Sequence, residues 1–195
     1  MRVCLAIGLF CSAIGFAHAQ TSQSAYTKTG GSDCKVRPVR QDGIDLGATI
    51  ICKGFAGIAV TQFEDDSRVA VSYGRKPSDE PAAGVFFGPL NTIGDMLEWR
   101  YVQDGKARKP YATILRWRLS PVDQNDQIKK LDILVVTRLA PGPVCHVAYV
   151  DAEANKDAND LARREADEKA KSFRCGTDKP ALIGNPGRAA AYVDR

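Results

Sequence analysis

The chain has 195 residues, of which 26% are charged, and a formal net charge of +4. This length suits one domain with a hydrophobic core of its own. So small an excess of positive charge does not indicate a nucleic-acid-binding protein.

The first 19 residues have the pattern of a signal peptide. Arg2 gives a short positive region, residues 3–16 are apolar, and Ala17-His18-Ala19 matches a cleavage site. The apolar run is too short to cross a membrane. We therefore expect residues 1–19 to be removed, leaving a periplasmic or secreted protein without a transmembrane segment.

Cysteine usage supports this expectation. Cys4 and Cys11 lie in the signal peptide, and four cysteines remain: Cys34, Cys52, Cys145 and Cys175. An even set in an exported chain is typical of disulfides, and free buried thiols are the disfavoured alternative. Sequence alone allows three pairings; we choose Cys34–Cys52 and Cys145–Cys175 because each pair joins near neighbours in the chain.

The chain divides into a short lead, one domain and a tail. Residues 20–33 are polar and glycine-rich and predict a flexible lead. Residues 177–195 are rich in Gly, Pro and Ala and predict a loosely ordered tail. Residues 34–176 then form a single disulfide-stapled domain. Alternating apolar residues bounded by turn residues predict its strands: residues 48–53, 57–63, 68–73, 85–87, 96–102, 111–119, 131–139 and 144–150.

Residues 96–102 and 111–119 form the clearest strand pair, with the turn dipeptide Asp104-Gly105 between them. By alternation, each strand has one apolar face. These two faces form the predicted core, and they consist of Leu97, Trp99, Tyr101, Leu115, Trp117 and Leu119.

After residue 150 the apolar period changes to three and four residues, which predicts a helix over residues 156–173 with Asn155 as its N-cap. Its buried face is mostly alanine and buries little area, so the Cys145–Cys175 disulfide is expected to anchor it. Acid-first pairs are expected on its wet side: Asp160–Arg164, Glu165–Lys169 and Asp167–Lys171. The predicted fold class is α+β, an antiparallel sheet or half-barrel with one long C-terminal helix packed on it.

Several stretches together resemble a family of small exported bacterial proteins with no established activity. They are Cys52-Lys53-Gly54-Phe55-Ala56-Gly57, Val71-Ser72-Tyr73-Gly74, Cys145-His146-Val147-Ala148-Tyr149-Val150-Asp151, residues 157–163 and Phe173-Arg174-Cys175-Gly176. The resemblance covers most of the mature chain. It implies export and a single domain, and it says nothing about mechanism.

The most distinctive polar feature is a set of arginines on the predicted hairpin. Arg100, Arg116 and Arg118 project from one face, with Glu98 beside them. One interpretation is a shallow binding site for an anionic ligand or an acidic protein surface. The other, which we favour, is a face of cross-strand ion pairs with Glu98 and Asp132 as partners.

His146 is the only histidine after the signal peptide, and alternation places it on the face away from the helix. We expect a core or edge histidine, because no nucleophile motif accompanies it. Glu64-Asp65-Asp66 lacks the spacing of a calcium loop and is expected to be a solvated turn, and no cofactor motif is found.

These patterns favour a non-catalytic exported module that binds through its sheet face. The alternatives are a cryptic hydrolase that uses Glu98 and an Asp on a neighbouring strand, and a structural envelope protein. No metal site, cofactor or nucleic-acid partner is expected.

Overall fold

The computed structural model describes residues 21–193, so the predicted signal peptide lies outside the described residues. The strands are β1 (Ser22–Lys28), β2 (Cys34–Gln41), β3 (Ile44–Cys52), β4 (Val60–Asp65), β5 (Arg68–Tyr73), β6 (Asn91–Asp104), β7 (Ala107–Leu119), β8 (Leu131–Arg138), β9 (Cys145–Asp151) and β10 (Ala181–Leu182). The α-helix is α1 (Ala158–Lys169).

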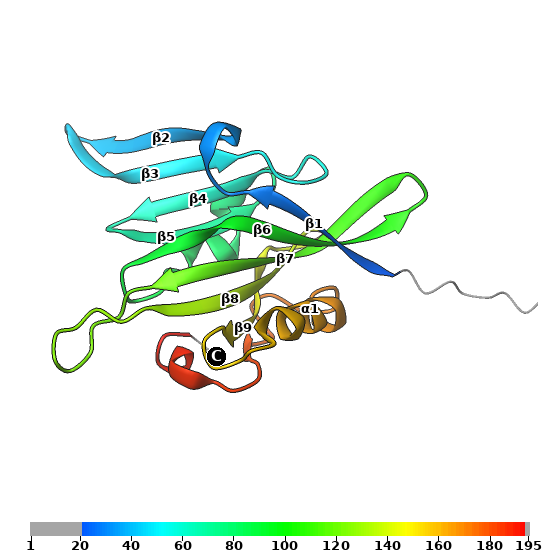
Figure 1. Ribbon diagram of the computed structural model, residues 1–195. Coiled ribbons are helices and arrows are strands. Elements are labelled where there is room, and N and C mark those ends of the chain that lie inside the picture. The colour runs from blue at the N-terminus through cyan, green and yellow to red at the C-terminus, as the bar shows by residue number, and fades with distance from the viewer. Residues whose placement is uncertain (1–20, 194–195) are drawn as a thin grey trace, which may run out of the picture.

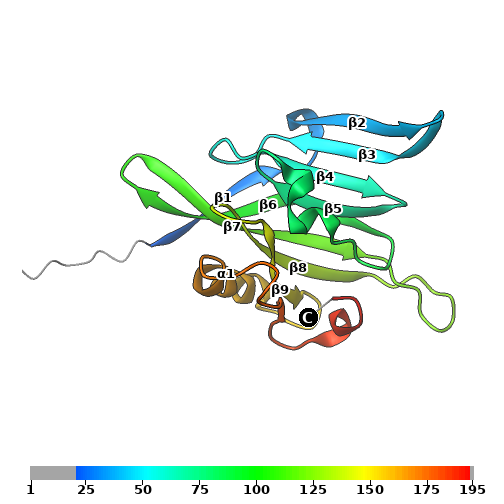
Figure 2. The ribbon, with the colours of Figure 1, turned by 180° about the vertical axis from the view of Figure 1, so that it is seen from behind.

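The strands form two sheets. A six-stranded sheet has the order β1-β6-β7-β8-β9-β10, and a four-stranded sheet has the order β2-β3-β4-β5. All pairs are antiparallel except β9 with the short β10. The small sheet and α1 lie at opposite ends of the molecule, with the large sheet between them (Figures 1 and 2).

The main core lies between the two sheets. Trp99 and Trp117 are fully buried there, as predicted, and they face residues of β4 and β5 such as Val60 and Val71. The indole N–H of Trp117 donates to the backbone oxygen of Val69 at 3.1 Å. Buried indoles need such a partner, so this bond fixes how β5 sits on the large sheet.

A second core lies between the large sheet and α1. Leu161, Ala162 and Ala166 pack against Leu134 and Val150 from the opposite face of the sheet. The alanine-rich buried face of the helix is therefore confirmed. Because β8 is covered on both faces, nearly all its residues are buried, as its continuous apolar sequence predicts.

The α+β class holds in its coarse form, with antiparallel sheets and a helix packed on one of them. Two details are corrected. There are two sheets rather than one sheet or half-barrel, because β6 to β8 carry apolar residues on both faces and need a layer on each side.

The helix is also short rather than long, with 12 residues. At its start, the side-chain amide of Asn155 donates to the backbone oxygens of Asp151 and Asn185, at 2.9 and 2.8 Å. Asn155 therefore holds the preceding turn, and Asp157 takes the N-cap position. At the other end, Arg138 donates to the backbone oxygen of Ala170 at 3.2 Å, just after the last helical residue.

The predicted flexible lead is corrected over residues 22–28, which form β1. This strand pairs with β6 from Ser22↔Val102 to Lys28↔Met96. Its side chains contact both faces of the large sheet. The hydroxyl of Thr27 accepts a bond from the Trp99 indole at 2.8 Å, and on the other face the hydroxyl of Ser24 donates to Glu98 at 2.5 Å. The polar composition of these residues does not predict a strand, because the contacts of β1 are largely hydrogen bonds.

The predicted loose tail is corrected too. Ala189 and Val193 are buried in the main core. The carboxylate of Asp151 accepts hydrogen bonds from the backbone N–H groups of Glu153, Ala154 and Ala189, at 2.9, 2.9 and 3.0 Å. Through Asp151, the end of β9 holds the tail against the domain.

Both predicted disulfides are confirmed. Cys34–Cys52 joins the neighbouring strands β2 and β3, and Cys145–Cys175 joins β9 to the segment after α1. Disulfides of this kind are typical of proteins in oxidising compartments. No helix of the described residues is long and apolar enough to cross a membrane.

The second disulfide should hold the helix more than the sheet. In the double variant Cys145→Ser with Cys175→Ser, we expect hydrogen exchange to speed up in α1 while β8 stays slow, because β8 keeps both of its cores. The matched control is Cys34→Ser with Cys52→Ser, which should leave exchange in α1 unchanged. Equal acceleration in α1 and β8 would show that this disulfide stabilises the whole domain.

Candidate functional site

The four residues of the predicted binding face occupy two different places. Glu98 and Arg100 on β6 lie beneath α1, where both are only 7% exposed. Arg116 and Arg118 on β7 pair with Asp132 of β8 and Asp95 of β6 and remain partly exposed. The structure therefore brings Glu98 and Arg100 together and leaves Arg116 and Arg118 on a separate, open part of the sheet.

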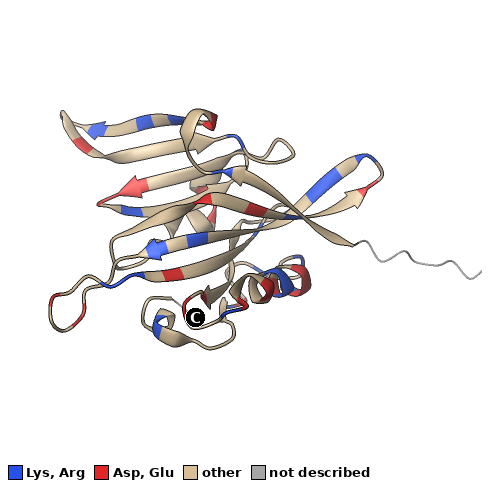
Figure 3. Ribbon diagram, in the orientation of Figure 1, with Lys and Arg blue, Asp and Glu red and all other residues tan. Residues whose placement is uncertain are grey.

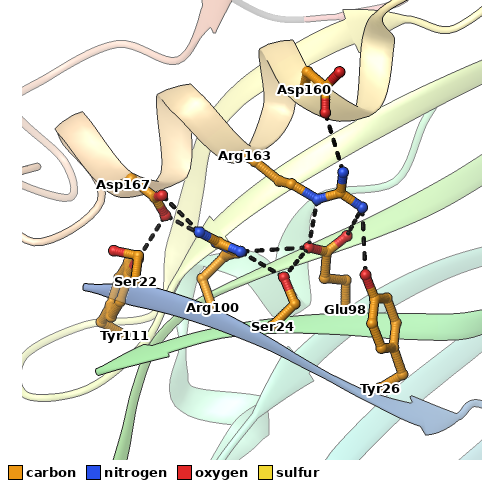
Figure 4. Close-up of polar contacts among 9 residues, drawn as sticks. All are labelled: Ser22, Ser24, Tyr26, Glu98, Arg100, Tyr111, Asp160, Arg163 and Asp167. Carbon is orange, nitrogen blue, oxygen red and sulfur yellow. Dashed lines mark hydrogen bonds and ion pairs between the residues drawn. The ribbon is translucent and has the colours of Figure 1, made fainter. Parts of the chain in front are cut away.

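Arg100 is held by a bidentate ion pair with the helix (Figure 4). Its Nε and Nη2 donate to the two carboxylate oxygens of Asp167, at 2.9 and 2.6 Å. Its Nη1 donates to the hydroxyl of Ser24 on β1 and lies 3.7 Å from the carboxylate of Glu98. Planar paired bonds of this type fix orientation as well as charge. Arg100 thus ties β1, β6 and α1 into one unit.

Glu98 is held in the same way from the other side. Arg163 of α1 donates to both of its carboxylate oxygens, at 2.8 and 3.1 Å, and Ser24 donates to one of them at 2.5 Å. Arg163 also contacts Asp160 at 3.1 Å and the hydroxyl of Tyr26 at 3.3 Å. Figure 4 shows these side chains as one chain of contacts along the underside of the helix.

The far end of this network is Tyr111 on β7. Its hydroxyl donates to Asp167 at 2.6 Å and lies 2.7 Å from the hydroxyl of Ser22. Lys171 sits over its ring, 4.2 Å from the centroid, a separation suited to a cation–π contact. We call this set of connected side chains the helix-docking network. Its members are Ser22, Ser24, Tyr26, Glu98, Arg100, Tyr111, Asp160, Arg163 and Asp167.

The contacts within the network shift pKa values so that Asp167 stays negative and Arg163 stays positive. Burial acts to raise the pKa of Asp167, but bonds from Arg100 and Tyr111 outweigh it, so this pKa is lowered. Burial and the Asp167 acceptor raise the pKa of Tyr111 to about 12. The bond to Glu98 raises the pKa of Arg163 despite its partial burial.

This arrangement bears on the hydrolase alternative. A carboxyl acting as a general acid needs a raised pKa, whereas the pKa of Asp167 is lowered. Glu98 is paired with the guanidinium groups of Arg100 and Arg163. Asp167 accepts bonds from the guanidinium of Arg100 and the hydroxyl of Tyr111. The geometry suits holding a helix on a sheet rather than transferring protons.

Of the two ion-pair partners expected from the sequence, Asp132 pairs with Arg116, whereas Glu98 pairs with Arg100 and Arg163. Arg116 lies 3.1 Å from Asp132 on the neighbouring strand β8, and both side chains are about one-third exposed. Arg118 lies 3.8 Å from Asp95, which is 89% exposed. Exposed pairs of this kind contribute only about 0–1 kcal/mol, so their partners can be exchanged at little cost.

His146 is enclosed in the main core with 3% exposure. It stacks on Phe87 and meets the edge of Trp117, and its Nδ1 lies 3.1 Å from the hydroxyl of Tyr149. Burial lowers its pKa to about 4, so the ring is neutral near pH 7. Of the two positions predicted for this histidine, core or edge, the structure shows the core.

Most partners in the network could not be identified from the sequence. Arg100 and Asp167 are 67 residues apart, and no local pattern joins them. One signal was present: Asp167 directly follows Ala166, a residue of the buried helix face. Among residues 21–193, no group of three or more His, Cys, Asp or Glu is arranged to hold a metal ion.

We compared the chain with models of known protein families, with curated proteins and with solved structures, and found no match in any of the three.

Proposed function

We propose that this protein is an exported, non-catalytic binding module that takes an anionic ligand or an acidic protein surface. The observation that carries the proposal is the open pair of arginines on β7. Their side chains are 31% and 48% exposed for Arg116 and Arg118, and their present partners are aspartates at the surface. An incoming carboxylate or phosphate can replace these partners without opening the core.

The contrast with Arg100 supports this choice of surface. Arg100 has the same side chain on the same face of the sheet, but α1 covers it and Asp167 occupies its planar donor face. Arg116 and Arg118 lie in a more open part of that face, where their guanidinium groups contact Asp132, Asp95 and the backbone oxygen of Ile93. Guanidinium groups that are accessible in this way are well suited to carboxylates and phosphates.

Two further observations support a place outside the cytoplasm. The chain begins with a signal-peptide pattern, and two disulfides staple the folded domain. Periplasmic or secreted proteins keep such bonds oxidised.

The test is capture of partners from a periplasmic extract by the purified mature chain. The double variant Arg116→Ala with Arg118→Ala should lose the captured partner and keep its thermal stability, because exposed ion pairs contribute little to folding. A matched control is Lys156→Ala with Arg164→Ala, which removes two exposed cations near and on α1. Intact capture together with a large loss of stability would contradict the proposal.

A further inference from the structure

The small sheet ends in a strand whose outer edge is open. β2 pairs with β3 on one side and is the last strand in the sheet order. Figures 1 and 2 both show β2 at the outer limit of the molecule. An open edge presents a row of backbone N–H and C=O groups that can pair with another extended chain.

The register shows which backbone groups are available. Cys34 and Cys52 are directly opposite, with their Cα atoms 3.9 Å apart. So short a separation marks a pair without ladder hydrogen bonds. Every second residue from Cys34 therefore directs its backbone groups away from β3, which makes the groups of Val36 and the carbonyl of Pro38 available at the edge.

The side chains of β2 have a different character on its two faces. Lys35 and Arg37 share one face by alternation, and both are exposed. With Lys53 they line a hollow of about 810 Å³, in which Asp33 is the one carboxylate among the lining residues. Within residues 21–193, none of these three cations forms an ion pair, unlike Arg116 and Arg118. Figure 3 shows positive residues repeated along β2.

The other face of β2 is apolar. Val36 lies between Lys35 and Arg37 and is 63% exposed. A strand paired with β2 would place its side chains alternately beside the cations and beside Val36, because neighbours across a pair lie on the same face. The edge therefore specifies a segment with acidic and apolar residues in alternation.

The same charges argue against a second copy of this chain. Two β2 edges in contact would bring Lys35 and Arg37 of each copy together, and like charges directly opposite are destabilising. Proline and basic residues are common devices that prevent self-pairing at sheet edges. An acidic segment is attracted by the side chains that repel a second copy.

We propose that an extended acidic segment of a partner protein adds to β2 as a further strand of the small sheet. Its carboxylates lie against Lys35, Arg37 and Lys53, its apolar residues lie against Val36, and its backbone pairs with the open edge. This is strand addition, in which backbone bonds give affinity and alternate side chains give specificity. The site is separate from Arg116 and Arg118, so either proposal can fail without the other.

The test uses a short fluorescein-labelled peptide of alternating Glu and Val and measures its fluorescence anisotropy with the full mature chain. We expect the double variant Lys35→Glu with Arg37→Glu to weaken binding about tenfold or more, from two exposed charge pairs. The same variant should gain binding to a peptide of alternating Lys and Val. The matched control, Lys156→Glu with Arg164→Glu, makes the same change in net charge near and on α1 and should leave both peptides unaffected.

A second peptide separates strand addition from simple charge attraction. It keeps the glutamates and has Pro in place of every Val, so it cannot pair as a strand, and we expect its binding to be lost. Hydrogen exchange at the Val36 N–H should slow only with the Glu–Val peptide. Equal binding of the proline peptide, an equal effect of the control variant, or self-association of the wild-type protein through β2 would each overturn the proposal.

Discussion

Replacing Arg100 with Ala should destabilise the domain by about 3 kcal/mol. Removing one partner of a buried ion pair leaves the other charge without compensation and costs about 3–5 kcal/mol. We expect the lower end of that range, because the side chain of Asp167 is 30% exposed and water can reach it. The measurement is the free energy of unfolding from denaturant titration.

The matched control is Arg116→Ala, which makes the same truncation on the neighbouring strand. Its partner Asp132 is similarly accessible, at 32%, but Arg116 itself is not enclosed, so we expect a loss below about 1 kcal/mol. A double-mutant cycle of Arg100→Ala with Asp167→Ala should show coupling between the two positions. Equal losses for Arg100→Ala and Arg116→Ala would show that the helix-docking network contributes nothing beyond surface pairing.

His146 should make the protein sensitive to mild acid. Its ordinary pKa of 6.5 falls to about 4 in the folded chain because burial disfavours the charged ring. As the pH drops below 6.5, the unfolded chain binds a proton that the folded chain does not take up until about pH 4. Stability is therefore lost over that window, by about 3 kcal/mol at its lower end.

The check compares the wild-type protein with His146→Gln, whose side chain stays neutral at every pH. Free energies of unfolding measured from pH 7 to pH 4 should fall more steeply for the wild-type protein. Carboxyl groups titrate in both proteins, so the difference between the two curves isolates the histidine. Parallel curves would show that the folded chain accepts the proton at His146 without cost.

The local part of this fold could be predicted from the sequence. Alternation and the dipeptide Asp104-Gly105 correctly placed the β6–β7 hairpin with Trp99 and Trp117 in the core. The dipeptide Asp42-Gly43 is a second turn signal in the sequence. Both residues have positive φ, 52° and 80°, as a tight hairpin turn requires. That signal predicts the β2–β3 hairpin, whose first strand was missed.

The long-range part could not be predicted in this way. The local pattern predicts an ion pair between Asp167 and Lys171 on the solvent-facing side of the helix. In the structure, the carboxylate of Asp167 instead pairs with Arg100 beneath the helix. The rule that charged residues face water fails where two opposite charges are buried together. β1 was missed for a related reason, since its pairing with β6 depends on hydrogen bonds and leaves no apolar signal.

The placement of the two disulfides has a consequence for how the protein matures. Cys34–Cys52 closes within the small sheet, and Cys145–Cys175 closes between β9 and the segment after α1, over 18 and 30 residues of chain. Neither bond joins the two sheets, so each can form before the sheets meet, and joining the sheets is then a non-covalent step. β1 is the first strand of the described chain, yet Ser24 meets Glu98 across 74 residues. β1 must therefore wait for a partner that is synthesised much later, and its pairing belongs to the closing stage of folding.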